Sequence, residues 1–204
     1  MLGAVNPPPI ALLDFWFGKL TDGLATPELR KRWFTHSEAF DEECRQFGDL
    51  WTSAQSGALK PDWQNPRHCL NFILLTDQIP RNIFRGTAAA FATDALARKV
   101  AHRGVQDQLD RTLAIDERAF FYLPFMHSEN IIDQHLAVGL FTGLRDSARK
   151  EHRSITGSWL RSAQRHRDIV MQFNRFPHRN TTLGRKSTAA EEDFTLVSTT
   201  FGQH

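Results

Sequence analysis

The chain has 204 residues and a mass of 23.3 kDa, which suits one domain able to fold without disulfides or metal. Hydrophobic residues make up 41% and charged residues 24% of the sequence, and the formal net charge is only +2. This balance excludes a strong overall electrostatic field, so nucleic acid is not an expected partner. The two cysteines lack C-x-x-C spacing, which excludes a disulfide scaffold and a zinc ribbon.

The N-terminal residues carry no export or membrane signal. Residues 1–9 form a proline-rich tail without the basic start and apolar stretch of a signal peptide. No run approaches the ~18 apolar residues needed to span a bilayer. We therefore expect a cytoplasmic protein in which residues 1–204 form a single all-helical domain. Sixteen Phe and five Trp predict an aromatic-rich core.

Helix signals recur through the first half of the chain. An apolar run over residues 10–17 predicts a short helix, and Thr26 followed by proline is a good start for the next one. Thr35 and Glu38 have the spacing of a capping box, so we expect one long amphipathic helix over residues 36–56.

A buried helix is expected after Asn65, which is followed by proline and then by a nearly continuous apolar stretch. Pro80 disfavours helical geometry at the residue before it, so the helix should end there. Arg81, Asn82 and Arg85 would then lie in a turn.

Turn and cap residues divide the second half of the chain. Gly104 is expected to end a helix in a left-handed conformation, Pro124 to interrupt another, and Ser128 to cap the one that follows. Residues 159–173 repeat apolar side chains at helical spacing and predict a second long helix.

A capping box at Thr188 and Glu191 opens a terminal helix. No strand alternation is present, so the predicted fold is all-α, built from antiparallel helical hairpins around one core.

Two polar segments form the candidate binding site. Residues 173–180 and residues 79–86 each combine proline with arginine and asparagine, whose side chains suit forked hydrogen bonding. If the fold brings them together, they form a cationic, donor-rich pocket for a small anionic molecule or a peptide carboxylate. The candidate ligand-binding residues are Asp77, Arg81, Asn82, Arg85, Arg175, Arg179, Asn180 and Arg185.

The same arginines have a structural interpretation of almost equal weight. They could pair with nearby carboxylates as internal struts, and Asn82 could close a turn through its own backbone. Asp77 ends an apolar run and would need a partner if buried, so we expect it to pair with Arg175 or Arg179.

Three residues are candidates for acid–base chemistry. His127, Glu129 and His178 include two histidines that titrate near neutrality and a carboxylate that can orient one of them. The alternative is that His127 and Glu129 only begin a helix. No metal-ligand spacing such as H-E-x-x-H is present, so neither a metal nor another cofactor is expected.

Four motifs together resemble a known bacterial family. They are Asp14-Phe15-Trp16-Phe17-Gly18, the segment from Asp77 to Thr87, His127-Ser128-Glu129, and Arg175 to Asn180 with Leu183-Gly184-Arg185. The chain resembles, over nearly its whole length, the domain of unknown function nine-two-four. The resemblance implies an all-helical, tetratricopeptide-like fold and no established activity. Ile79 and Asn174 depart from its pattern, which has phenylalanine and glycine there.

These observations leave several functions open. The first is a helical binding module with the cationic pocket described above. The second is a metabolic enzyme with hydrolase-type acid–base chemistry in the same pocket. Weaker alternatives are an RNA-binding protein or a protein-interaction scaffold with a protein partner, since the segment 161–186 is locally basic.

Overall fold

The computed structural model describes residues 10–197, and the predicted proline-rich tail at residues 1–9 lies outside them. These residues form helices and one isolated bridge between Thr21 and Leu24, so the all-α prediction is confirmed. The α-helices are α1 (Ile10–Phe17), α2 (Pro27–Arg32), α3 (Glu38–Cys44), α4 (Gly48–Gln55), α5 (Pro66–Ile73), α6 (Ile79–Ile83), α7 (Asp94–Gln106), α8 (Ile115–Met126), α9 (Ile131–Ser147), α10 (Arg153–Phe173) and α11 (Ala189–Val197). Shorter helical turns join several of them.

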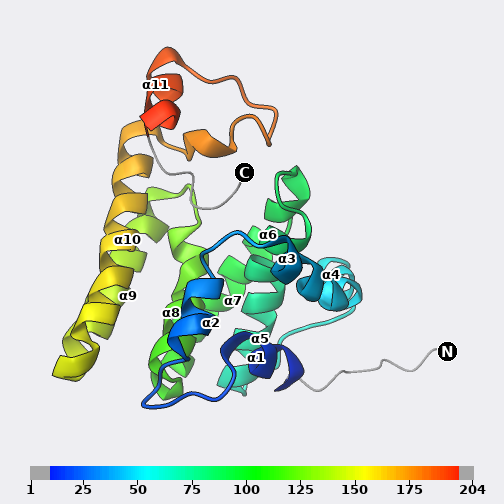
Figure 1. Ribbon diagram of the computed structural model, residues 1–204, viewed down its shortest axis with the longest axis vertical. Coiled ribbons are helices and arrows are strands. Elements are labelled where there is room, and N and C mark those ends of the chain that lie inside the picture. The colour runs from blue at the N-terminus through cyan, green and yellow to red at the C-terminus, as the bar shows by residue number, and fades with distance from the viewer. Residues whose placement is uncertain (1–9, 198–204) are drawn as a thin grey trace.

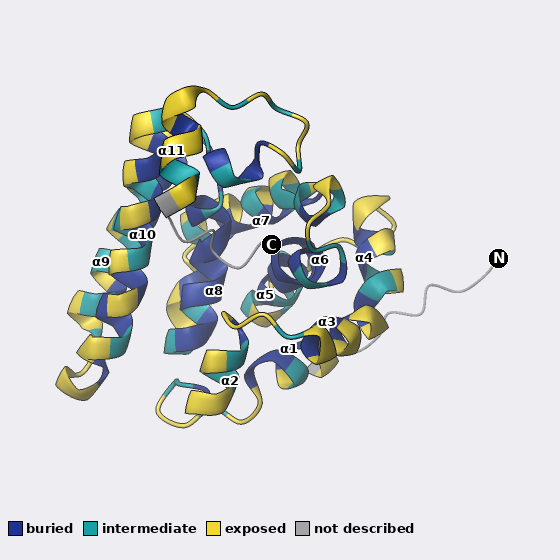
Figure 2. Cartoon of the chain, turned by 45° about the horizontal axis from the view of Figure 1, so that its top comes forward, coloured by how far each residue is buried: buried dark blue, intermediate teal, exposed yellow. Residues whose placement is uncertain are grey.

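The two longest helices, α9 and α10, run antiparallel along one side of the molecule (Figure 1). α8 lies beside them and is buried over most of its length, whereas α9 and α10 expose their outer faces (Figure 2). α5 and α7 pack on the other side of α8. This arrangement contains the predicted antiparallel pairing, while the tetratricopeptide-like repeat stays a prediction.

The centre of the fold is an aromatic cluster around Phe120 of α8, which is fully buried. Trp16, Phe17, Trp33 and Trp159 each direct an edge toward this ring, with centroids 4.7–5.8 Å apart. Edge-to-face pairs of this kind add to the hydrophobic gain of burying large rings. The predicted aromatic core is therefore present, and it connects α1, α2, α8 and α10.

Three helix starts follow the sequence signals closely. The Thr26 side chain accepts the N–H of Leu29, and the Asn65 side chain accepts two N–H groups of the first turn of α5. At α11 the Thr188 hydroxyl accepts the Glu191 N–H, while the Glu191 carboxylate accepts the Thr188 N–H. The predicted capping box is thus complete.

Other helix boundaries differ from prediction by a residue or two. Ser37, rather than Thr35, caps α3, and a 3₁₀ turn at Arg45–Phe47 divides the single helix expected over residues 36–56. Asn130, rather than Ser128, caps α9. In each case a second capping residue lies close by, and sequence spacing alone does not decide between them.

Neither internal proline ends its helix. A π-helix, Leu74–Gln78, continues α5 into α6, and the Ile79 N–H bonds the Leu74 carbonyl five residues back. This wider turn gives room to the Pro80 ring, so Arg81 and Asn82 lie on α6 and not in the predicted turn. Pro124 likewise lies within α8, which is held by burial on all sides.

Gly104 has a different role from the one predicted. It lies inside α7, where an added Cβ would stand 2.3 Å from Cζ of Phe121. Glycine therefore permits close packing of α7 on α8 and does not end the helix.

Among the described residues, no helix combines the length and apolar character needed to cross a membrane.

Candidate functional site

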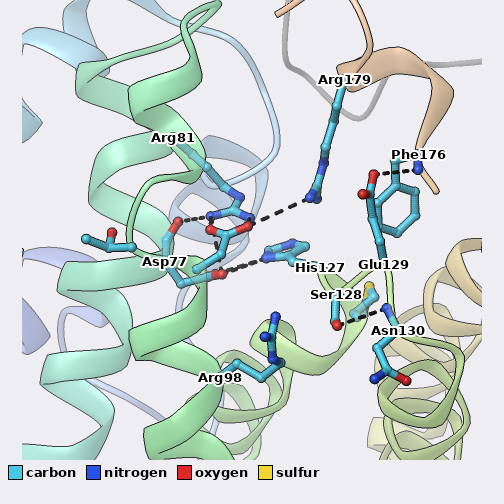
Figure 3. A network of polar contacts seen from close by, with 12 residues as sticks. Asp77, Arg81, Arg98, His127, Ser128, Glu129, Asn130, Phe176 and Arg179 are labelled. Carbon is cyan, nitrogen blue, oxygen red and sulfur yellow. Dashed lines mark hydrogen bonds and ion pairs between the residues drawn. The ribbon is translucent and has the colours of Figure 1, made fainter. Parts of the chain in front are cut away.

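The fold brings the two polar segments of the sequence together. Asp77 comes from the π-helix, Arg81 from α6, and Arg179 from the 3₁₀ turn Pro177–Arg179 that follows α10. Asp94 begins α7 and His127 caps the C-terminus of α8. Figure 3 shows Arg179 pointing toward the group formed by Asp77, Arg81 and His127. We call these five residues the buried charge cluster.

Asp77 is fully buried and accepts several hydrogen bonds. Its Oδ1 and Oδ2 lie 2.9 and 3.0 Å from Nδ1 of His127, and Gln78 donates to Oδ2. Nη1 of Arg81 is 3.2 Å from Oδ1. Burial raises the pKa of Asp77. The charges of Arg81 and His127, together with these hydrogen bonds, lower it by a larger amount, so the net shift is downward. Asp77 is therefore an ionised carboxylate, and it pairs with Arg81 and His127 and not, as predicted, with Arg175 or Arg179.

Arg81 uses its whole guanidinium fork. Nη1 and Nη2 donate to the two carboxylate oxygens of Asp94 at 2.8 and 2.9 Å, and Nη1 also donates to the Asp77 carbonyl. Burial lowers the pKa of Arg81, but the two carboxylates raise it above its usual value. Arg81 is a saturated structural cation, with little capacity left for a ligand.

His127 is held in one orientation by Asp77. Burial lowers the pKa of His127 below the ordinary histidine value, so the ring is neutral at pH 7. Because Asp77 is ionised, Nδ1 carries the proton and donates it, which leaves an unprotonated lone pair on Nε2. No hydrogen-bond partner of Nε2 lies among the described residues.

Arg179 is buried but poorly paired. Its side chain is 9% exposed, and its guanidinium lies over the rings of Phe91 and Phe176, 4.7 and 4.5 Å from their centroids. Within the described part of the chain, the nearest carboxylate oxygen is Oδ2 of Asp94, 3.7 Å from Nη1 and beyond hydrogen-bond distance. Nε has no acceptor among the described residues. Burial and the neighbouring charge of Arg81 lower the pKa of Arg179 to about 10.

The other two arginines of this region are internal struts. Arg175 donates to both oxygens of Glu191 at 2.5 and 2.7 Å, at the edge of an open surface pocket between α10 and α11. Arg185 donates to both oxygens of Glu129 at 2.7 and 2.9 Å. Glu129 also accepts the N–H of Phe176 at 2.7 Å, which ties the start of α9 to the loop that carries Arg179.

Glu129 is committed to these bonds. Burial raises its pKa, but the hydrogen bonds from Arg185 and Phe176 lower it by a larger amount. Glu129 is therefore ionised, and both of its oxygens accept hydrogen bonds. The structure therefore gives Glu129 a positioning role for the loop.

The remaining candidates lie outside the buried charge cluster. Arg85 forms a forked pair with Asp41, with both distances 2.8 Å, and Asn82 donates to the Gln78 carbonyl at 3.0 Å. Asn180 is buried and accepts from Nε of Arg185 at 3.0 Å. His178 is half-buried, and its ring centroid is 5.5 Å from that of Phe176.

Sequence reasoning missed Asp94, which stands in the first turn of an amphipathic helix with nothing in its local sequence to distinguish it. The helical spacing of residues 159–173 favours a packed or hydrogen-bonded histidine at position 166, and the structure confirms this. His166 of α10 is buried, donates from Nδ1 to the Ser162 carbonyl at 2.8 Å, and lies 6.4 Å from His127 between ring centroids. Burial lowers its pKa to about 3, so it too is neutral.

The described residues contain no group of three or more His, Cys, Asp or Glu side chains placed to hold a metal ion. Both cysteines are buried thiols. Burial raises the pKa of Cys44 to about 12 and that of Cys69 to about 11, so neither is a thiolate nucleophile.

The fold and the cluster together define an all-α protein with a buried arginine, aspartate and histidine network beneath a tethered loop. The chain belongs to the family described as bacterial protein of unknown function (DUF924), whose model matches residues 12–197. A solved structure of a protein of unknown function from Agrobacterium tumefaciens is similar, with 36% identity, a TM-score of 0.77, and coverage of 92% of this chain and 96% of that one. No curated protein matches the chain.

Proposed function

We propose that this protein binds a small anionic molecule, or a peptide carboxylate, through Arg179. The observation that carries the proposal is that Arg179 is buried and yet makes no side-chain hydrogen bond with the described residues. Buried charged groups in proteins are normally paired, because removing an unpaired charge from water costs roughly several kcal/mol. A ligand carboxylate or phosphate supplies the two oxygens that fit this fork.

The charges around Arg179 support an anion over a cation. The buried charge cluster holds two aspartates, of which Asp77 is ionised, and two arginines, while His127 is neutral. Arg81 takes both oxygens of Asp94 and one of Asp77, so these carboxylates are already satisfied. Arg179 is the cation of the cluster that has no close carboxylate partner among the described residues. Phe91 and Phe176 cover its guanidinium with apolar surface, which strengthens an ion pair formed there.

The test compares arginines of the same region. Purified protein is first examined by native mass spectrometry for a retained small molecule. Succinate, inorganic phosphate, and one short peptide with either a free or an amidated C-terminus are then titrated by calorimetry. We expect binding of at least one of these anions, and a loss of at least about tenfold in affinity in Arg179→Met, because a forked, charge-assisted pair contributes at least about 1.4 kcal/mol.

Arg175→Met is the matched control, because it removes an equal charge from the same loop region but breaks only the pair with Glu191 and the hydrogen bond to the Lys186 carbonyl. It should bind as the wild type does. Preference for the free over the amidated peptide identifies a peptide carboxylate, and preference for succinate or phosphate identifies a small anion. Equal binding by the wild type and Arg179→Met would contradict the proposal.

A further inference from the structure

His127 belongs to the same buried charge cluster as Arg179. It lies below the Arg179 guanidinium in Figure 3, with Asp77 on one side. The carboxylate fixes Nδ1 at 2.9 and 3.0 Å, as in a serine hydrolase, where a buried aspartate fixes the tautomer of the basic histidine. Binding of an anion requires only Arg179, so binding alone leaves this oriented histidine unexplained.

Resting on the function proposed above, we propose that the Asp77–His127 pair is the acid–base centre of a hydrolytic reaction on an ester or amide of a small carboxylate-bearing acid. Arg179 holds the carboxylate, and His127 faces the bond that is cleaved. Asp77 is a positioning residue, since it acts only through the imidazole ring.

The attacking group in this reaction is water. Nε2 of His127 has no hydroxyl or thiol partner among the described residues. The two nearby serines are occupied elsewhere, since Ser128 donates to Asp133 at 2.7 Å and Ser162 donates to Sδ of Met126 at 3.7 Å. A histidine base without a side-chain nucleophile activates water directly.

The step balances with water as the only co-reactant. Nε2 takes a proton from water while the water oxygen bonds to the carbonyl carbon, and the carbonyl π electrons move to its oxygen. The tetrahedral intermediate then collapses, the bond to the leaving oxygen or nitrogen breaks, and that atom takes the proton from Nε2. A carboxylic acid and an alcohol or amine result, and His127 is again neutral.

The groups around the ring favour this cycle. Asp77 from the π-helix stabilises the imidazolium that forms, while Arg81 from α6 and Asp94 from α7 offset one another as an ion pair. His166 from α10 is neutral and adds no charge. A neutral histidine paired with a carboxylate can accept a proton during the reaction and return it afterwards.

The test uses 4-nitrophenyl esters of succinic acid and of acetic acid, with release of nitrophenolate as the readout. His127→Asn keeps an N–H donor near the position of Nδ1 and removes Nε2. We expect the wild type to prefer the succinate half-ester over the acetate ester, and His127→Asn to lose at least about 100-fold in kcat. Calorimetry should show that the variant still binds succinate, and circular dichroism that it is folded.

Asp77→Asn supplies a second measurement, because a merely structural role would not alter the pH dependence of the rate. We expect its pH–rate profile to change together with a loss of kcat, at unchanged affinity for succinate. Turnover in His127→Asn equal to the wild type, or no wild-type turnover of either ester above buffer, would overturn the proposal. If succinate binds through Arg179 without turnover of the half-ester, this inference fails and the binding function stands. If succinate, phosphate and the peptides all fail to bind, both fail.

Discussion

Replacing Arg179 by methionine should leave the folded protein as stable as the wild type, or more stable, in the absence of ligand. The side chain is buried, and no carboxylate of residues 10–197 lies within hydrogen-bond distance of it. Burial lowers its pKa from 12.5 to about 10, which corresponds to an unfavourable interaction of about 3–4 kcal/mol for the charged form, at about 1.4 kcal/mol per pKa unit. Methionine has a similar shape without the charge, and its sulfur packs favourably against the rings of Phe91 and Phe176.

Part of this gain is offset, because the guanidinium contacts with the two rings contribute roughly 1–2 kcal/mol that methionine replaces only in part. The expected net change in the free energy of unfolding is therefore between about 0 and +2 kcal/mol. Asp94 does not lose its partner, since Arg81 holds both of its oxygens.

Urea unfolding of the two proteins at pH 7, followed by circular dichroism, measures this difference. Arg175→Met is the control of opposite sign: it leaves Glu191 without its forked partner and should lower the free energy of unfolding. A loss of more than about 1 kcal/mol in Arg179→Met would show that Arg179 also stabilises the fold, contrary to this prediction.

Two further predictions concern packing and pH. Gly104→Ala should destabilise the protein by about 1–3 kcal/mol, because the added Cβ would meet Phe121. Gly143→Ala should stabilise α9 by about 0.5–1 kcal/mol, because the added Cβ would have no atom within 4 Å. Thermal unfolding of both variants tests this pair, and a stabilised Gly104→Ala would contradict the prediction. The pKa of His166 is about 3 in the folded protein and 6.5 in the unfolded chain. Below pH 6.5 the unfolded chain therefore binds more protons than the folded protein does. This lowers the free energy of unfolding by about 2 kcal/mol at pH 5. His166→Gln should lack this part of the loss between pH 7 and pH 5 in urea unfolding, and an unchanged loss would exclude His166 as its source.

The fold class was predictable from local signals because the helices carry their own apolar spacing, and several of them also have a side-chain cap. Thr26, Asn65 and Thr188 act only on the turn beside them, so their sequence context contains the whole cause. The prolines behave differently. Pro80 follows a π-helix and Pro124 is enclosed by the core, and in both cases packing outweighs the local cost of a missing N–H donor.

The site was predictable only in part. The repeated arginine and asparagine pattern correctly indicated two segments that meet, and Arg81 and Arg179 do converge. Which carboxylate pairs with which arginine depends on contacts between elements, and these have no signature in either segment. Asp94 illustrates the limit, because it is an ordinary first-turn acid of α7 in sequence and the shared partner of two arginines in space.

That sharing also explains why Arg179, and not Arg81, is left for a ligand. Asp94 has two oxygens, and the Arg81 fork takes both of them in the plane that suits a bidentate pair. Arg81 is further anchored by Asp77 one helical turn before it, whereas Arg179 approaches from a separate loop held by Arg185 and Glu129. The protein therefore contains one more buried arginine than the cluster's carboxylates can bind closely, and it holds that arginine beside an oriented, neutral histidine. Asp94→Asn should weaken the pairing of Arg81 and leave both arginines short of acceptors. The affinity for an added anion should therefore rise, while the free energy of unfolding falls. Calorimetry with succinate measures the first effect, and urea unfolding measures the second.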